Sequence, residues 1–214
     1  MSSFFLSRLT AAFALICCAT RADAAPIVWS TASGGNGHSY EAISTQPNTI
    51  SWSQANADAQ ALGGYLATIT SSAENNFVYS LIDSSPYWYV LDPDHSYGPW
   101  IGGFQSPPVS DPTVNWTWVT GEPFSYSSWA TGEPNHYEGF AEDYIQYFAT
   151  DGPLMAPTWN DDTDAPSGIN FPESYVVEFN PSPVPEPASL VLFAIGGFGL
   201  SGAAIVRRRR LLRR

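Results

Sequence analysis

The feature that most limits how this chain can fold is the absence of lysine and arginine from residues 25–185. All eight basic residues of the 214-residue chain lie outside this stretch, whereas 18 of the 20 acidic residues lie within it. A domain built from these residues has no Lys or Arg to pair with its carboxylates. It must expose them to water, hydrogen-bond them or neutralise them with metal ions. Nucleic acid is excluded as a partner, because phosphate binding requires cationic side chains.

Residues 1–24 have the pattern of a signal peptide. Arg8 precedes a short apolar run, and a small-x-small sequence ends at Ala24, so we expect cleavage after that residue. The apolar run is too short to span a bilayer. Both cysteines of the chain lie in this segment. The mature chain is therefore expected to have neither a disulfide nor a zinc–thiolate site.

The C-terminal end has a different pattern. Residues 188–206 form an uncharged apolar stretch of 19 residues, which is about the length of a transmembrane helix. Six arginines follow within residues 207–214, and their charge is expected to hold this basic tail in the cytoplasm. Residues 181–187 form a proline-rich linker, which cannot continue a helix or a central strand. Residues 25–180 are therefore expected to form one domain.

Two helices and a series of short strands are predicted within this domain. Ser51 and Ser71 each begin a capping-box pattern, so a helix is expected to start after each of them. Gly63 and Gly64 end the first helix. Turn residues divide most of the rest into short strand-like pieces at 65–69, 100–104, 116–119, 144–148 and 175–179. Helices followed by short strands predict an α+β fold with an antiparallel sheet and long loops.

A series of motifs over residues 38–180 resembles the C-type lectin domain. In chain order these are Trp52 with Ala55 and Ala59, Gly64–Ile69, Glu74-Asn75, Trp100–Gly103, Trp116–Trp118, Gly132–Asn135, Glu142-Asp143, Trp159–Asp161 and Val177–Phe179. The resemblance implies a C-type lectin-like fold, with two helices, small antiparallel sheets and long loops. That family often has cysteines where this chain has Tyr144 and Val177. These two side chains are expected to pack together in place of the crosslink.

The resemblance also implies a Ca²⁺ site. Five residues would give oxygen ligands: Glu133, Asn135, Glu142, Asn160 and Asp161. All of them except Asp161 would also hydrogen-bond a sugar, whose adjacent hydroxyls would complete the coordination of the ion. The resemblance implies a cis peptide bond before Pro134, which directs both neighbouring side chains to the metal. The order Glu-Pro-Asn resembles the mannose, glucose and fucose group of these lectins.

Several residues near this site remain open to two interpretations. Asp162 and Asp164 could hold a second calcium ion or be solvated loop acids, and the same choice applies to Asp143. His136 directly follows the motif and could touch a ligand or be a plain exposed histidine. His95 shows no metal-ligand spacing.

Nearby aromatic residues and an upstream copy of the motif also need interpretation. Tyr137, Phe140 and Trp129 could offer an apolar surface to a sugar, or could belong to the core. Residues 120–123 repeat the sequence Thr-Gly-Glu-Pro, but Phe124 follows them in place of an asparagine. This upstream copy lacks the amide ligand and is expected to be a structural turn.

The end of the chain resembles a second family, the PEP-CTERM sorting signal of Gram-negative bacteria. The resemblance rests on Pro185, Glu186 and Pro187, the apolar stretch and the arginine block. It implies export, a transient inner-membrane intermediate and cleavage by an exosortase-type protease. The product would then be extracellular or on the cell surface. A permanent single-span anchor is the alternative.

Together these features predict a calcium-dependent carbohydrate-binding protein that acts on or in an extracellular polysaccharide matrix. A structural or protein-binding domain without a sugar site is the alternative. An enzyme is not expected, because no nucleophile is paired with a histidine. The mature chain also lacks the cysteines on which formylglycine-forming oxidases of related fold depend.

Overall fold

The computed structural model of this protein describes residues 25–150, 152–164 and 172–181. The expected signal peptide (1–24), the expected transmembrane helix (188–206) and the basic tail lie outside the described residues. Among the described residues, no helix is both long and apolar enough to cross a membrane.

Two α-helices start where the sequence predicts them. They are α1 (Trp52–Ala61) and α2 (Ser72–Ile82), and each is preceded by a serine whose hydroxyl oxygen accepts the backbone N–H three residues later. Only this half of each capping box forms. The Glu74 carboxylate instead accepts the N–H and O–H of Thr70, at 2.7 and 2.8 Å. Glu74, which would complete the second capping box, thus holds the loop before α2 instead.

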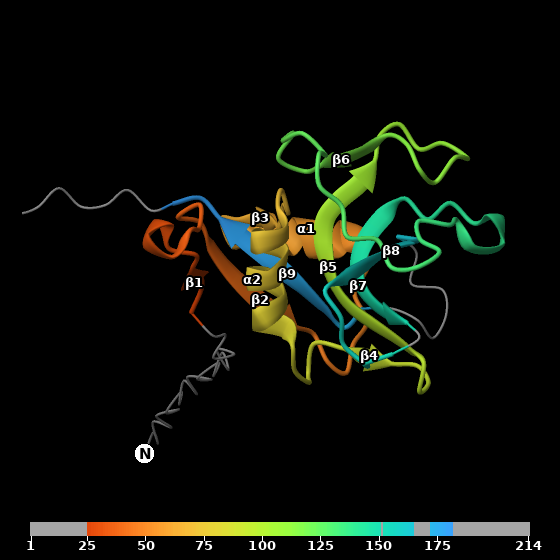
Figure 1. Cartoon of the computed structure of the whole chain (residues 1–214), viewed down its shortest axis with the longest axis horizontal. Helices are drawn as coiled ribbons and strands as arrows, with labels where there is room; N and C mark the ends of the chain where they lie inside the picture. Colours follow the sequence, from red (N-terminus) through yellow and green to blue (C-terminus); the bar gives the residue numbers. More distant parts are fainter. Residues whose placement is uncertain (1–24, 151, 165–171, 182–214) are drawn as a thin grey trace, which may run out of the picture.

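Nine strands join into one sheet, with β5 (His95–Gln105) at its centre (Figure 1). The others are β1 (Ile27–Val28), β2 (Ser39–Ser44), β3 (Tyr65–Leu66), β4 (Tyr89–Val90), β6 (Trp116–Trp118), β7 (Tyr144–Thr150), β8 (Thr158–Asp162) and β9 (Ser174–Phe179). β5 pairs with β4, β6 and β7, and a single parallel contact between Trp100 and Tyr175 links it to β9. All other strand pairings among the described residues are antiparallel. Because β5 is long enough to pair at both ends, the strands form one connected sheet. Neither β2 nor β8 is among the predicted strands.

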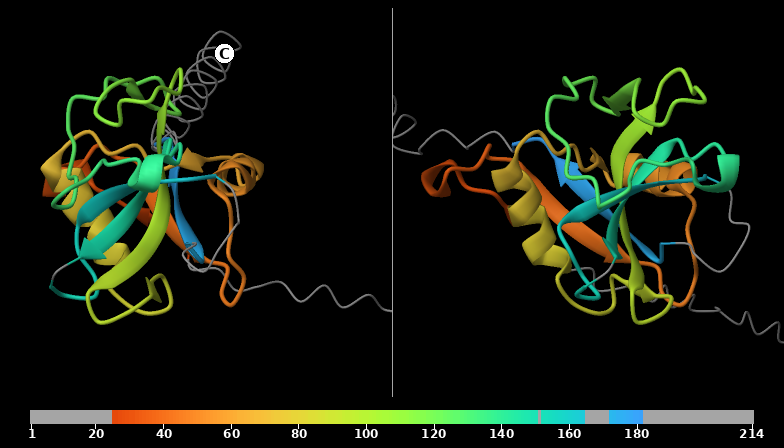
Figure 2. Two further views of the ribbon diagram at one scale, coloured as in Figure 1. Left: turned by 90° about the vertical axis from the view of Figure 1, so that its right-hand side faces the viewer. Right: turned by 45° about the vertical axis from the view of Figure 1, so that its right-hand side comes forward.

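The two helices lie on opposite sides of the sheet (Figure 2), and each covers its own hydrophobic cluster. The cluster under α2 contains Trp118 and Trp159, and that under α1 contains Trp52 and Trp100. Tyr144 and Val177, the residues at the expected crosslink positions, both belong to the α1 cluster. The Tyr144 ring lies 4.7 Å from that of Trp52, so aromatic packing occupies this place.

Gly102 shows why the Trp-Ile-Gly stretch needs a glycine. A Cβ at this position would lie 2.5 Å from the backbone oxygen of Leu66, a distance at which the backbone must shift. The Gly102 N–H donates to the oxygen of Ala67 at 2.8 Å, so the close approach is also hydrogen-bonded.

A Gly102→Ala substitution is therefore expected to destabilise the domain by about 1–3 kcal/mol, as overpacking does in cores. Gly152→Ala is the control, because the nearest atom to its added Cβ would be 3.8 Å away. Urea denaturation of both variants measures the difference. Equal stability of the two variants would contradict the close packing of β5 on β3.

Two buried carboxylates, Glu74 and Glu178, join α2 to the sheet through Tyr40. The Tyr40 O–H lies 2.6 Å from an oxygen of Glu74 and 3.2 Å from one of Glu178. The Thr68 N–H donates to the second oxygen of Glu178 at 2.8 Å, and the His38 ring contacts the first. Burial outweighs these bonds and raises the pKa of Glu178 from its ordinary 4.5 to about 7.

Part of the pH dependence of stability follows from this pKa. Since the folded state binds the Glu178 proton more tightly than the unfolded chain, the contribution is complete below about pH 4.5 and is lost as the pH rises through about 7. Glu178→Gln is expected to flatten this fall in thermal melts between those two values. The exposed Glu122→Gln should keep the wild-type slope, and an unchanged slope in Glu178→Gln would contradict the assignment.

Candidate functional site

The loop that carries the Glu-Pro-Asn motif is attached to β8. Trp129 and Trp159 form an isolated bridge, and the Ala130 N–H donates to the oxygen of Trp159 at 2.8 Å. The Glu133–Pro134 peptide bond is cis. The start of the motif loop is therefore hydrogen-bonded to β8, the strand that also carries the Trp-Asn-Asp residues.

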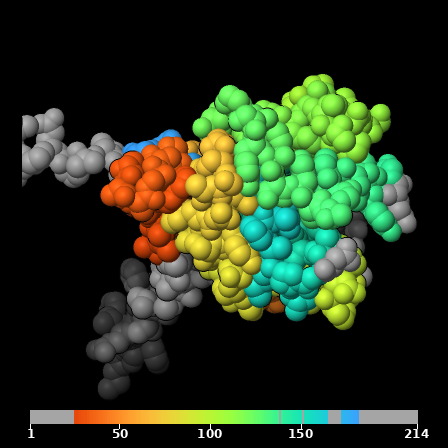
Figure 3. Space-filling view, in the orientation of Figure 1, coloured from red at the N-terminus to blue at the C-terminus, as the bar shows by residue number. Residues whose placement is uncertain are grey.

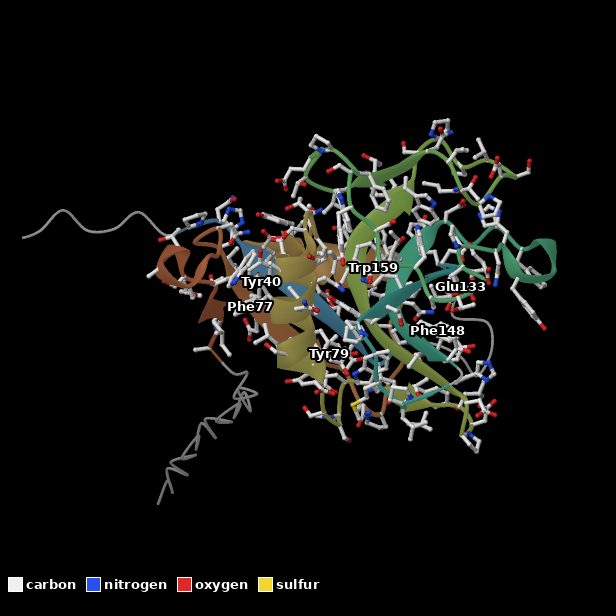
Figure 4. The ribbon with its side chains drawn as sticks, viewed as in Figure 1. Tyr40, Phe77, Tyr79, Glu133, Phe148 and Trp159 are labelled. Carbon is white, nitrogen blue, oxygen red and sulfur yellow. The ribbon has the colours of Figure 1, made fainter. Side chains whose placement is uncertain are left out.

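Four of the five expected ligands line one pocket of about 410 Å³: Glu133, Asn135, Glu142 and Asn160. They come from the motif loop, the residues before β7 and strand β8, three stretches that are separate in the sequence. Figure 4 labels Glu133 on this side of the molecule, above Phe148, which lines the same pocket. Figure 3 shows the green loop and the cyan segment of β8 side by side on this face. The fold thus gathers oxygen-bearing side chains from all three motifs.

Asp161, the fifth expected ligand, is placed differently. Side chains alternate along β8, so Asn160 and Asp162 reach the pocket lining, whereas Asp161 is fully buried and does not line it. Its carboxylate accepts the backbone N–H groups of Asn135, at 2.9 and 3.1 Å, and of His136, at 3.0 Å. In this arrangement Asp161 holds the backbone of the motif.

The negative charges of the two expected carboxylate ligands in the pocket are poorly compensated by hydrogen bonds or positive groups. Burial, followed by the charge of Asp161, raises the pKa of Glu133 to about 8. Burial also raises the pKa of Glu142 to about 8, against the opposing effect of the Tyr137 N–H, which donates to it at 2.6 Å. The buried Oε2 of Glu133 has no hydrogen-bond partner among the described residues. A bound cation would relieve this desolvation and repulsion, since residues 25–185 contain no Lys or Arg.

The chemistry of these side chains suits calcium. Within the described residues, no three His, Cys, Asp or Glu side chains are gathered closely enough to hold a metal by themselves. Two of the four expected ligands in the pocket are asparagines, and Ca²⁺ accepts amide and carboxylate oxygens alike. Asp162, on β8, adds a further carboxylate to the lining and accepts a hydrogen bond from Gln146 at 2.6 Å.

Several neighbouring residues differ from their expected exposure. His136 is only 8% exposed, with its buried Nε2 unpartnered among the described residues, so the interpretation as a plain exposed histidine is wrong. Asp143, at 9% exposure, is not a solvated loop acid. Asp164 accepts the N–H of Ser53 at 2.7 Å and also its hydroxyl, so it caps the start of α1. Asp164 thus holds the end of the segment after β8 against α1.

The aromatic residues divide between surface and core. Tyr137 and Phe140 are 62% and 60% exposed, which favours their interpretation as an accessible apolar surface. Trp129 packs against Trp116 at 5.0 Å and Trp159 at 6.0 Å, so it belongs to the core side. Glu122, in the upstream Gly-Glu-Pro copy, is exposed, accepts the hydroxyl of Thr120 and does not line the pocket. The expected structural turn is therefore found there.

The sequence interpretation missed one side of the pocket. Leu91, Asp92, His95, Tyr97 and Phe148 also line it. Four of them come from the hairpin of β4 and β5, in the part that precedes Trp100. The signal was the aromatic and aspartate-rich sequence between α2 and Trp100, but nothing in it shows which way the hairpin folds.

The fold of this chain is similar to that of several solved structures. The cow C-type carbohydrate-recognition domain of CD23, solved in the presence of a GlcNAc2Man3 oligosaccharide, is 20% identical, with a TM-score of 0.50. The match covers 69% of this chain and 91% of that one. Human lithostathine is 23% identical, with a TM-score of 0.49 over 67% of this chain and 84% of its own. At these identities the likeness concerns the fold. No curated protein sequence matches the chain.

Two sequence families match separate parts of the chain. Residues 183–210 match the PEP-CTERM protein-sorting motif, which indicates export and sorting to the cell surface. Residues 48–164, more than half of the chain, match the lectin C-type domain. Lectin domains bind carbohydrate and are not enzymes, so the expectation of a non-enzymatic protein is confirmed. On the fold and on this match, the chain belongs to the C-type lectin domain family.

Proposed function

We propose that this protein is an exported lectin that binds carbohydrate through a calcium ion. Glu133, Asn135, Glu142 and Asn160 would hold the ion, and Asp161 would support them. The observation that carries the proposal is the convergence of these four side chains, from three separate stretches, on one pocket. The raised pKa values of Glu133 and Glu142 support it, because such carboxylates lack a cationic partner.

The carboxylate and amide ligands would have different roles in binding the sugar. Calcium takes roughly 6–8 oxygens at about 2.3–2.6 Å, and it would supply open positions for two adjacent sugar hydroxyls. The carboxylates of Glu133 and Glu142 accept the protons of those hydroxyls. The amide N–H groups of Asn135 and Asn160 donate to the hydroxyl lone pairs. The order Glu-Pro-Asn supports mannose, glucose or fucose as the preferred sugar.

Asp161 would support the calcium site without lining the pocket. Its carboxylate holds the N–H groups of Asn135 and His136, so it sets the backbone position of the amide ligand. A direct bond from Asp161 to calcium would require these hydrogen bonds to be exchanged for the metal. Both roles make the residue necessary for calcium binding.

A structural or protein-binding domain is the second candidate. The use of the Asp161 carboxylate by backbone amides favours it, because a domain without calcium needs such bonds to hold the loop. The exposed rings of Tyr137 and Phe140 would then serve a protein partner. Binding of carbohydrate that is lost with a calcium chelator separates the two candidates.

Calcium is expected to raise the melting temperature of the wild-type protein and to permit binding to immobilised mannose. At a calcium concentration of one hundred times Kd, the stabilisation would be about 2.7 kcal/mol. For a domain of this size it corresponds to a shift of roughly 5–10 °C. Glu133→Gln should lose most of this shift and the binding to mannose.

Glu122→Gln is the matched control, because Glu122 stands in the same Thr-Gly-Glu-Pro sequence but outside the pocket. It should retain the full calcium shift. A wild-type protein that shows no calcium shift and no chelator-sensitive binding to sugar would leave the structural or protein-binding candidate.

The sorting of the protein is proposed from its two ends. A signal peptide of residues 1–24 directs export, and the apolar stretch 188–206 holds an inner-membrane intermediate. An exosortase-type protease then cuts at Pro185, Glu186 and Pro187, and the lectin domain reaches the extracellular polysaccharide matrix. The match of residues 183–210 to the PEP-CTERM motif supports this order.

In a bacterium with an exosortase, mass spectrometry of the released protein is expected to show a chain that starts at Ala25 and lacks residues 188–214. Replacing Pro185, Glu186 and Pro187 with alanine should keep the full C-terminus in the membrane fraction. If the wild-type protein also keeps its arginine tail in the membrane, the tail is a permanent anchor.

A further inference from the structure

The hairpin of β4 and β5 forms one wall of the pocket beside the proposed calcium site. Tyr89 pairs with Tyr97, and the Leu91 N–H donates to the oxygen of His95 at 3.0 Å. In its turn, Asp92 Oδ1 accepts the N–H of Asp94 at 2.8 Å. Figure 1 shows β4 at the end of β5 that also pairs with β7. Local hydrogen bonds therefore hold the hairpin in place.

One side of the pocket is aromatic. The ring of Phe148, on β7, lies 6.2 Å from the His95 ring in a stacked arrangement and 5.2 Å from the Tyr97 ring. All three residues line the pocket together with Glu133 and Asn160. Phe148 is only 5% exposed, so it supports the His95 ring, whose side chain is 41% exposed. A flat exposed ring beside hydrogen-bonding groups is a surface on which the C–H face of a sugar can lie.

Tyr97 connects this aromatic side to the proposed calcium ligands. Burial raises its pKa to about 12, and the charges of Asp162, Glu142, Asp92 and Glu133 act in the same direction. The hydroxyl is therefore protonated at neutral pH, and Tyr97 lines the pocket together with Glu133 and Glu142. It can donate a hydrogen bond to a ligand that extends from one side to the other.

The charge of the hairpin limits what such a ligand can be. The Asp94 N–H lowers the pKa of Asp92, so this exposed carboxylate is ionised at neutral pH. The Asp92 side chain contacts the His95 ring at 3.0 Å. No Lys or Arg in residues 25–185 can pair with an anionic sugar here. A uronate placed on the hairpin would meet a like charge, whereas a neutral sugar would find a hydrogen-bond acceptor.

We propose that the hairpin forms a second sugar subsite, so that the pocket takes two consecutive neutral units of a polysaccharide. The unit with free adjacent hydroxyls lies at the calcium ligands, and the next unit lies on the exposed ring of His95, which Phe148 supports, beside Asp92. The inference rests on the proposed function and adds to it that the ligand is a neutral glycan chain. The charge of Asp92 disfavours an acidic unit at this subsite.

Titration calorimetry with calcium tests this subsite on the exported form of the protein. The probes are methyl β-mannoside, β-1,4-mannotriose and the β-1,4-mannuronate trimer, with the corresponding glucose and glucuronate set. The neutral trimer should bind about tenfold more tightly than the single sugar, the size of one good aromatic contact. The uronate trimer should bind no better than the single sugar.

Two variants test the aromatic contact of His95 and the charge of Asp92 separately. His95→Ala should reduce the affinity for the neutral trimer to within about twofold of that for the single sugar. It should leave the affinity for the single sugar and the calcium-induced melting shift unchanged. Asp92→Asn keeps the acceptor for the Asp94 N–H and should raise binding of the uronate trimer. Asp111→Asn is the matched control, because Asp111 accepts the N–H of Thr113 in a similar turn outside the pocket.

The failures of the two proposals can be distinguished. Equal affinities of the single sugar and the neutral trimer, or a trimer preference that survives His95→Ala, would overturn the second subsite and leave the calcium-dependent lectin standing. A uronate trimer that binds as well as the neutral one would overturn the charge argument. No calcium-dependent binding of any probe would overturn the proposed function together with this inference.

Discussion

Every carboxylate in the folded domain has to be accommodated without a lysine or arginine partner, and this constraint accounts for much of the structure. Asp161 is satisfied by backbone N–H groups, and Glu178 by an N–H together with Tyr40 and His38. Asp164 accepts from the first turn of α1. Glu133 and Glu142 are different, because burial leaves their pKa values near 8 with few hydrogen bonds. Two poorly compensated acids of the described domain thus lie in one pocket, where a ligand can reach them.

Strand β8 links the hydrophobic core to this pocket. Trp159 packs in the α2 cluster, and Asp161, on the same side of the strand, holds the backbone of the motif loop. Asn160 and Asp162 point the other way and line the pocket. Because neighbouring residues on a strand face opposite sides, packing of the tryptophan sets the direction of the asparagine. The packing of Trp159 in the core therefore determines the position of Asn160, a proposed calcium ligand.

The sequence predicts local features well and tertiary ones less well. Ser51 and Ser71 locate both helix starts because a cap depends on residues three positions away. The motifs also identify the four side chains that meet in the pocket. Strand β8 is not predicted, because its sequence Thr-Trp-Asn-Asp-Asp is rich in turn-forming residues and is held by pairing with β7. The burial of His136 depends on distant contacts in the same way. The hairpin wall is missed because the direction of a hairpin depends on the sheet to which it pairs.

The two Thr-Gly-Glu-Pro copies show how a common short sequence acquires a specific role. In the upstream copy, Glu122 bonds to the nearby Thr120 and stays exposed after β6. In the downstream copy, the loop is bridged to β8, and the residue after the proline is an asparagine whose N–H is held by Asp161. Four identical residues thus have different environments because only one copy meets a buried carboxylate from another strand. The same reasoning applies to the whole pocket, in which residues that are ordinary in the sequence become a candidate binding site through the strand against which they fold.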